Sequence, residues 1–286
     1  MVRNPIVGPL GRGLKGLLAK VKGRRDAAII EQLARAPHPH AEKIAWALGH
    51  LGDGAPVEDR DWITRVETER ERLLSLDTPL EDGSIEGYSG PDDTGITISQ
   101  ACHDSKRAKP ALMLYLLTRA LKPQRIIELG TNVGISSAFL GAAMKMNGGG
   151  SIVTLDGHPY KQKVAADVHG NLGLDNITYV PGLFADTLGD ALQHAAPVDI
   201  AFIDGHHQYQ PTLDYFEAIL PHSATDAVFV FDDIRWSAGM AKAWAELRAD
   251  ERFGLVVDLQ SIGICARAEK PSAPRTVLPP IHNALR

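Results

Sequence analysis

The sequence predicts an α/β fold in which a mostly parallel sheet of about seven strands carries helices on both faces. In the second half of the chain, apolar runs of five or six residues alternate with segments of helical periodicity. Strands that are buried on both faces of a sheet are typically continuous apolar runs of this kind. Several of the runs end in an acidic residue or a glycine, at the sheet edge where such folds hold their ligands.

The elements follow one another at regular intervals. Strands are expected over residues 125–128, 151–155, 176–180, 198–203, 227–231, 255–259 and 263–266. Helices are expected between them, over residues 160–172, 186–194, 209–220 and 239–247. Parallel neighbouring strands need such crossover helices, so the alternation predicts one domain over residues 96–268.

The flanking regions differ in character. Residues 1–25 contain seven Lys or Arg and no acid, which predicts a flexible basic tail. Residues 26–95 predict a helical extension with an apolar face at Trp62, Ile63, Val66, Leu73 and Leu74, followed by a linker rich in Asp, Gly, Pro and Ser. We expect this extension to cover the ligand site or to pair subunits in a homodimer. Residues 269–286 predict a surface tail.

Composition restricts the classes of function. The formal net charge of −5 gives no reason to expect nucleic acid as the main partner. No run of 18 apolar residues is present, so no membrane span is expected. Cys102 and Cys265 are expected to be reduced thiols. Together these features predict a cytoplasmic protein that acts on small molecules.

The first strand leads into the run Glu128-Leu-Gly-Thr-Asn-Val-Gly134. A dinucleotide fingerprint would need glycine at positions 132 and 135, and a phosphate loop would need a lysine after the second glycine. Neither is present. The run instead suits a ligand without phosphate, whose carboxylate meets the helix amides and whose ammonium faces Glu128, and S-adenosylmethionine is such a ligand. The alternative is an ordinary strand-to-helix turn.

Asp156 ends the second strand and could accept both ribose hydroxyls of a nucleoside. The alternative is that it caps the helix that starts near His158 and Pro159. Because it follows one helix and one strand after the glycine turn, the two motifs together favour nucleoside binding.

Acidic residues and a histidine follow the next two strands. Asp204 follows the fourth strand, Asp232 and Asp233 follow the fifth, and three carboxylates at one edge predict a hard cation such as Mg²⁺. His207 could accept the proton of a hydroxyl group that is to be methylated. The alternatives are that the aspartates cap loops and that His207 only holds Asp204 in place.

These motifs resemble the class I S-adenosylmethionine-dependent methyltransferases. The residues are Glu-Leu-Gly-Thr-x-x-Gly-x-Ser from 128, Phe-Ile-Asp-x-x-His from 202 and Phe-Asp-Asp-Ile-x-Trp-Ser-x-Gly-Met from 231. They are most similar to the metal-dependent O-methyltransferases of the catechol and caffeoyl-coenzyme A kind. Asp233 and His207 replace an asparagine and a lysine of the catechol pattern, in a manner similar to a branch that methylates antibiotic intermediates.

The resemblance implies a Rossmann-like methyltransferase fold and assigns roles to single residues. His207 would be the general base, and Asp204, Asp232 and Asp233 would bind the metal. Cofactor contacts are expected from Glu128, Gly130, Thr131, Asn132, Gly134, Ser136, Asp156 and Asp204.

The sequence thus predicts methylation of a small hydroxylated metabolite, with S-adenosylmethionine as methyl donor and a divalent cation at the acceptor oxygen. One alternative is a metal-independent N- or O-methyltransferase in which Asp232 and Asp233 orient the nucleophile. The other is a nucleoside-binding protein without turnover.

Overall fold

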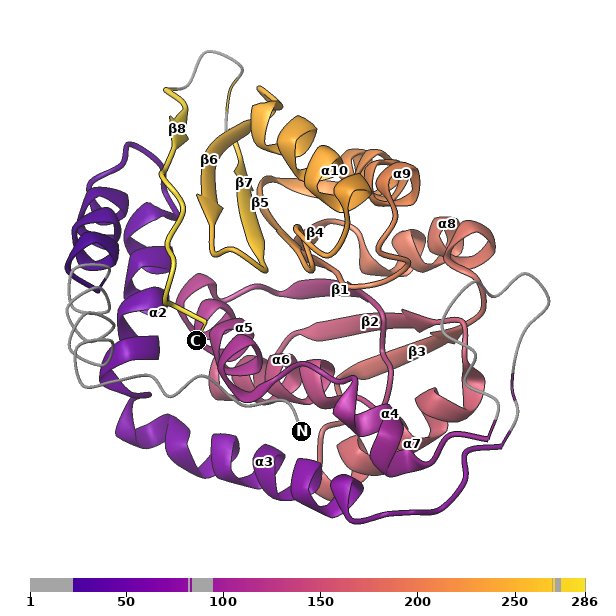
Figure 1. Cartoon of the computed structure of the whole chain (residues 1–286). Coiled ribbons are helices and arrows are strands. Elements are labelled where there is room, and N and C mark those ends of the chain that lie inside the picture. Colours follow the sequence, from indigo (N-terminus) through magenta and orange to yellow (C-terminus); the bar gives the residue numbers. More distant parts are fainter. Residues whose placement is uncertain (1–22, 82, 84–94, 269, 271–273, 286) are drawn as a thin grey trace, which may run out of the picture.

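A computed structural model describes residues 23–81, 83, 95–268, 270 and 274–285. Its centre is one sheet with the strand order β3-β2-β1-β4-β5-β7-β6-β8 (Figure 1). Most of the predicted basic tail and most of the predicted linker lie outside the described residues. The strands are β1 (Arg125–Leu129), β2 (Ser151–Asp156), β3 (Ile177–Pro181), β4 (Val198–Ile203), β5 (Ser223–Phe231), β6 (Phe253–Asp258), β7 (Gly263–Arg267) and β8 (Thr276–Val277).

The sheet confirms the predicted α/β fold, with eight strands in place of about seven. Strands β1 to β5 are parallel to one another, whereas β7 lies between β5 and β6 and is antiparallel to both. Chain order reverses between β1 and β4, so the carboxyl ends of these two strands flank the point where open sheets bind ligands.

Alternate residues of the strands enter two separate cores, one on each face of the sheet. In β4, Phe202 belongs to the core covered by α5 (Ala108–Leu121) and α6 (Ile135–Met146). Its neighbour Ile203 belongs to the core beneath α8 (Phe184–Ala195), α9 (Tyr209–Ile219) and α10 (Ala238–Ala249). Because both faces are covered, the parallel strands are apolar at nearly every position.

The N-terminal extension is helical, as predicted, and its apolar residues join the first of these cores. It comprises a helix over residues 23–34, α2 (Ala41–Asp53), the short 3₁₀ helix η1 (Val57–Asp59) and α3 (Arg60–Leu74). Val66 and Leu73 of α3 are fully buried in the same core as Phe139 of α6. The extension therefore packs directly against the sheet domain (Figure 1).

Residues 97–121, for which the sequence indicated no element, form α4 (Ile98–His103) and α5. Thr97 caps α4 with a reciprocal pair of hydrogen bonds to Gln100, an arrangement that fixes the start of a helix. Residues 104–107 link the two helices and enter the site described below. The remaining helix α7 (Pro159–Leu172) starts with proline at its first position.

The C-terminal region corrects the prediction of a surface tail over residues 269–286. Thr276 and Val277 pair with β6 as the edge strand β8, and Leu278 and Ile281 are fully buried. Asp26 of the N-terminal helix accepts hydrogen bonds from the backbone N–H groups of His282 and Asn283. A short apolar run was enough to add an edge strand, although it is too short to give a periodic pattern.

Two predictions from composition can be compared with the described residues. Cys102 and Cys265 are buried free thiols. Within the described part of the chain, every helix is too short or too polar to span a lipid bilayer.

Candidate active site

A cavity of about 360 Å³ lies at the carboxyl ends of β1, β2 and β4. It is lined by six of the eight residues predicted to contact a cofactor, together with His207. The six are Gly130, Thr131, Asn132, Ser136, Asp156 and Asp204. Motifs that are distant in the sequence therefore share one cavity.

Gly130 forms the turn between β1 and α6, as predicted. Its φ of +108° lies in the region that favours glycine. A Cβ atom at this position would lie 2.2 Å from the carbonyl oxygen of Asp204. The missing side chain thus lets the turn pass directly over the chain that leaves β4.

Gly134 packs the start of α6 against α7. It has φ +84° and precedes the first residue of α6, but it does not line the cavity. A Cβ atom here would lie 2.7 Å from Cβ of Ala165 in α7. The glycine is therefore required for the packing of α6 against α7, and it affects a ligand only through the position of the helix.

Glu128 lies behind the cavity lining in this structure. It lies one residue inside β1, is fully buried and does not line the cavity. Its Oε2 accepts a hydrogen bond of 2.6 Å from the hydroxyl of Thr154, whereas Oε1 has no partner among the described residues. Burial raises the pKa of Glu128 to about 7, and hydrogen bonds from Ser136 and Thr154 limit the rise. Ser136 lines the cavity, so Glu128 approaches the site only behind that side chain.

Asp156 organises two turns at the cavity wall. Its Oδ2 accepts from the backbone N–H of Asn132 at 2.7 Å, and its Oδ1 accepts from that of His158 at 2.8 Å. The side chain is almost fully buried, and burial raises its pKa, although both hydrogen bonds oppose the rise. Each carboxylate oxygen has a second lone pair, so Asp156 can still accept from a ligand hydroxyl.

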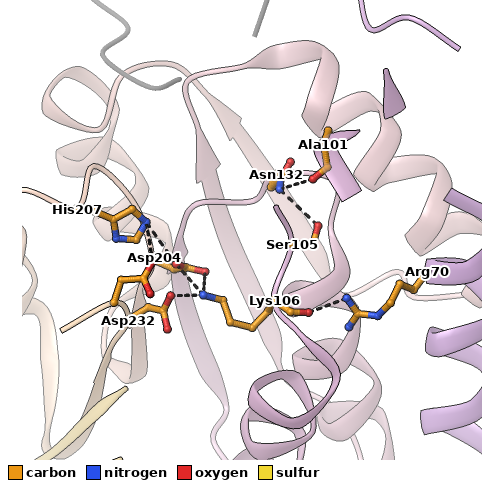
Figure 2. Close-up of polar contacts among 9 residues, drawn as sticks. Arg70, Ala101, Ser105, Lys106, Asn132, Asp204, His207 and Asp232 are labelled. Carbon is orange, nitrogen blue, oxygen red and sulfur yellow. Dashed lines mark hydrogen bonds and ion pairs between the residues drawn. The ribbon is translucent and has the colours of Figure 1, made fainter. Parts of the chain in front are cut away.

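Lys106, from the link between α4 and α5, extends between the two aspartates that were predicted to bind a metal (Figure 2). Its Nζ lies 3.0 Å and 3.1 Å from the two carboxylate oxygens of Asp204 and in contact with Oδ2 of Asp232. The side chain is 13% exposed. Burial lowers the pKa of Lys106, but the two carboxylates outweigh burial and raise it above the usual range. Lys106 is therefore an ammonium at neutral pH.

This arrangement does not fit a divalent cation. A doubly charged ion about 4 Å from an ammonium would be repelled by roughly 8 kcal/mol at an effective dielectric constant of about 20. Among the described residues, no group of three or more His, Cys, Asp and Glu side chains is arranged to hold a metal. Asp232 and Asp233, two of the three predicted ligands, do not line the cavity. The cation between Asp204 and Asp232 in this structure is Lys106.

His207 lines the cavity beside the acidic cluster. Its Nε2 lies 3.7 Å from Oδ1 of Asp204 and 3.8 Å from Oδ2 of Asp233, which is too far for hydrogen bonds. Figure 2 shows His207 and Lys106 on different sides of Asp204. Burial lowers the pKa of His207, although Asp233 and Asp232 oppose the change. The imidazole is thus neutral near pH 7 and able to accept a proton.

Backbone strain is concentrated around the cavity. Asn132, His206, His207 and Asp233 all have positive φ, between 31° and 65°. Such conformations are uncommon for residues other than glycine, and they gather at functional sites where the surrounding structure enforces them. The strained residues come from three different strand ends, so the strain belongs to the site as a whole.

Several further lining residues were not identified from the sequence, among them Lys106, Lys161 and Phe184. Lys161 lies in the first turn of α7, five residues after Asp156. A basic residue so close to the end of the second strand is a sequence signal for this site. Phe184 starts α8 opposite the β4 turn, where a Cβ atom on Gly205 would lie 2.5 Å from its ring. Lys106 lies in a polar link and shows no local signal.

Comparison with known proteins agrees with this fold. Residues 127–234 match a family model described as a methyltransferase domain. No curated protein matches the sequence.

Two solved structures share the fold. The SAH-bound methyltransferase PaMTH1 of Podospora anserina is 17% identical and has a TM-score of 0.54, with 71% of this chain and 88% of that chain covered. The cofactor-bound protein Rv0187 from MTB is 18% identical and also has a TM-score of 0.54, with 76% and 94% covered. These structures confirm the fold that the resemblance to class I methyltransferases implied, and residues 127–234 match the methyltransferase-domain model.

Proposed function

We propose that this chain, which carries a methyltransferase domain, transfers a methyl group from S-adenosylmethionine to a hydroxyl oxygen of a small molecule. One observation carries the proposal. A single cavity is lined by the glycine turn and Asp156 together with Lys106, Asp204 and His207. A methyl donor and an acceptor could therefore meet within it.

The described residues fit the cofactor. The turn at Gly130 to Asn132 and the carboxylate of Asp156 line the cavity where a nucleoside with an amino-acid end would be held. Neither a dinucleotide nor a phosphate loop is indicated by the glycine spacing. The Podospora protein of the same fold was solved with SAH bound. When bound, the cofactor would supply an electrophilic methyl group on a sulfonium.

The acceptor side fits transfer to oxygen. A hydroxyl placed near His207 can pass its proton to Nε2 as its oxygen forms the new bond to the methyl carbon, and the bond from sulfur to that carbon breaks. The thioether product leaves neutral and the imidazole becomes an imidazolium. Asp204 and Asp233, each within 4 Å of Nε2, stabilise that positive charge.

We propose this transfer without a divalent cation. The sequence predicted one, but Lys106 already lies between Asp204 and Asp232. A protein of Klebsiella pneumoniae that is described as a candidate O-methyltransferase has the same fold, with 19% identity and a TM-score of 0.51. That similarity favours oxygen as the acceptor atom.

We assign residues 26–95 to an extension that supports the site from outside the cavity. We assign residues 96–268 to the methyltransferase domain itself. Arg70 of α3 donates a hydrogen bond of 2.6 Å to the carbonyl oxygen of Lys106. This bond supports a role of the extension in shaping the acceptor side of the cavity.

The test combines ligand binding and turnover. Calorimetry should show binding of S-adenosylmethionine and S-adenosylhomocysteine but not of NAD. Incubation of the full chain with hydroxylated metabolites and a donor carrying a deuterated methyl group should give a product with the corresponding mass gain, also after exhaustive chelation. Binding of NAD alone would overturn the cofactor assignment. Tight cofactor binding without product from a broad panel would favour a nucleoside-binding protein.

A further inference from the structure

Lys106 lies in the link between α4 and α5, which contacts two other segments of the chain. Its carbonyl oxygen accepts from Arg70, which is itself buried and bonded to Glu67 at 2.8 Å. The preceding residue, Ser105, accepts a hydrogen bond of 3.4 Å from the side-chain amide of Asn132. Lys106 is therefore placed by the extension and by the cofactor turn together (Figure 2).

The side chain of Lys106 joins two carboxylates that would otherwise repel each other. Asp204 follows β4 and Asp232 follows β5, and these strands are paired in register up to Ile203 and Phe231. The side chain of Asp232 is buried and that of Asp204 is only 14% exposed, so two negative charges at these neighbouring strand ends repel each other strongly unless a cation lies between them. In this structure the cation is the ammonium of the protein's own lysine.

An ammonium differs from a metal ion in what it offers to a ligand. Lysine carries three N–H donors, and two are enough for Asp204 and Asp232. The hydrogen bonds to Oδ1 of Asp204 and Oδ2 of Asp232 use two of these donors, and Lys106 also lines the cavity in which an acceptor would lie. A divalent cation would present several open positions and would bind an oxygen by coordination.

We propose that the Lys106 ammonium takes the place of a divalent cation in this site, holding Asp204 and Asp232 together and donating its remaining N–H to the acceptor oxygen. This inference rests on the proposed function for the identity of the acceptor oxygen. The replacement of a divalent cation by the Lys106 ammonium does not depend on that function. It predicts that the position between the two aspartates accepts a metal only after the lysine charge is removed.

The experiment measures Mn²⁺ binding to the full chain by electron paramagnetic resonance, without cofactor or acceptor. The wild-type chain should leave millimolar Mn²⁺ free, whereas Lys106→Ala should bind one ion per chain. A second substitution, Asp232→Asn, in the Lys106→Ala chain should remove that binding. Lys145→Ala serves as the matched control, because Lys145 is ion-paired to the exposed Asp175 outside the cavity and its loss should create no Mn²⁺ site.

Folding is verified for each variant by its thermal transition. If Lys106→Ala does not fold, Lys106→Ser tests the same gain of Mn²⁺ binding with a polar side chain. Stoichiometric binding to the wild-type chain that is lost with Asp232→Asn would overturn the proposal, because the metal would then displace the lysine. Absence of Mn²⁺ binding in the folded lysine variants would also overturn it, since the position would not be a cation site. Both readouts are independent of turnover, so a failure of the proposed methyl transfer would be recognised separately.

Discussion

Replacing Asp156 with alanine separates its possible structural and ligand-binding roles. The carboxylate accepts hydrogen bonds from the backbone N–H groups of Asn132 and His158, at 2.7 and 2.8 Å. The same side chain lines the cavity at the position where we place the ribose of the cofactor. Asp156→Ala should therefore lower both the stability of the free chain and its affinity for S-adenosylmethionine.

The two losses have different magnitudes. Leaving two buried N–H groups without partners costs about 1 to 3 kcal/mol each, and relief of the buried charge returns part of this, so we expect a net loss of about 2 to 4 kcal/mol in stability. Loss of charge-assisted hydrogen bonds to two ribose hydroxyls should weaken cofactor binding by about 1.5 to 3 kcal/mol, or roughly 10- to 150-fold in Kd.

Asp199 provides a matched control at the amino-terminal ends of the strands, opposite the cavity. Its Oδ2 accepts from the backbone N–H groups of Gln124 and Arg125, at 2.7 and 2.9 Å, where β1 begins. Asp199→Ala should lower stability while leaving cofactor affinity nearly unchanged. Thermal unfolding and calorimetry of both variants give the comparison. Unchanged affinity in Asp156→Ala, or an equal loss in Asp199→Ala, would refute a direct role of Asp156 in cofactor binding.

Two further predictions concern ionisable groups. His207→Gln should lower turnover by about 10²- to 10⁴-fold with little change in cofactor affinity. The substitution should also abolish the decrease in rate of the wild-type enzyme below pH 6.5, because burial lowers the pKa of the histidine. Near-normal turnover with the same pH profile would show that His207 is structural. For Glu128, burial raises the folded-state pKa to about 7 from 4.5. Its contribution to the free energy of unfolding is therefore complete below pH 4.5. That contribution falls by about 3 kcal/mol as pH rises towards 7. Without cofactor, the Tm of Glu128→Gln should decrease less between pH 5 and pH 8 than that of the wild-type chain. If the two Tm values change in parallel with pH, Glu128 does not have a raised pKa.

The fold could be predicted because burial on both faces of the sheet determines residue type directly. Strands such as β4 are apolar along most of their length, and the expected bounds of β4 match those observed. Gly130 could also be assigned, since a tight turn after a strand requires positive φ. The edge strand β8 could not, because two residues give no periodicity. The role of Gly134 depends on Ala165 in a separate helix, which no local pattern specifies.

The acidic cluster shows where local patterns stop being sufficient. Parallel strands place their carboxyl ends side by side, so the meeting of Asp204 and Asp232 follows from the order of β4 and β5. The need for a compensating positive charge also follows, since two adjacent carboxylates with little exposure to solvent repel each other unless a cation lies between them. The identity of that charge does not follow. Lys106 is 98 residues before Asp204, in a link whose path is set by Arg70 and Asn132. The strand ends therefore predict the two carboxylates and a metal between them. In the folded chain the cation is instead Lys106, which comes from a region that carries no motif.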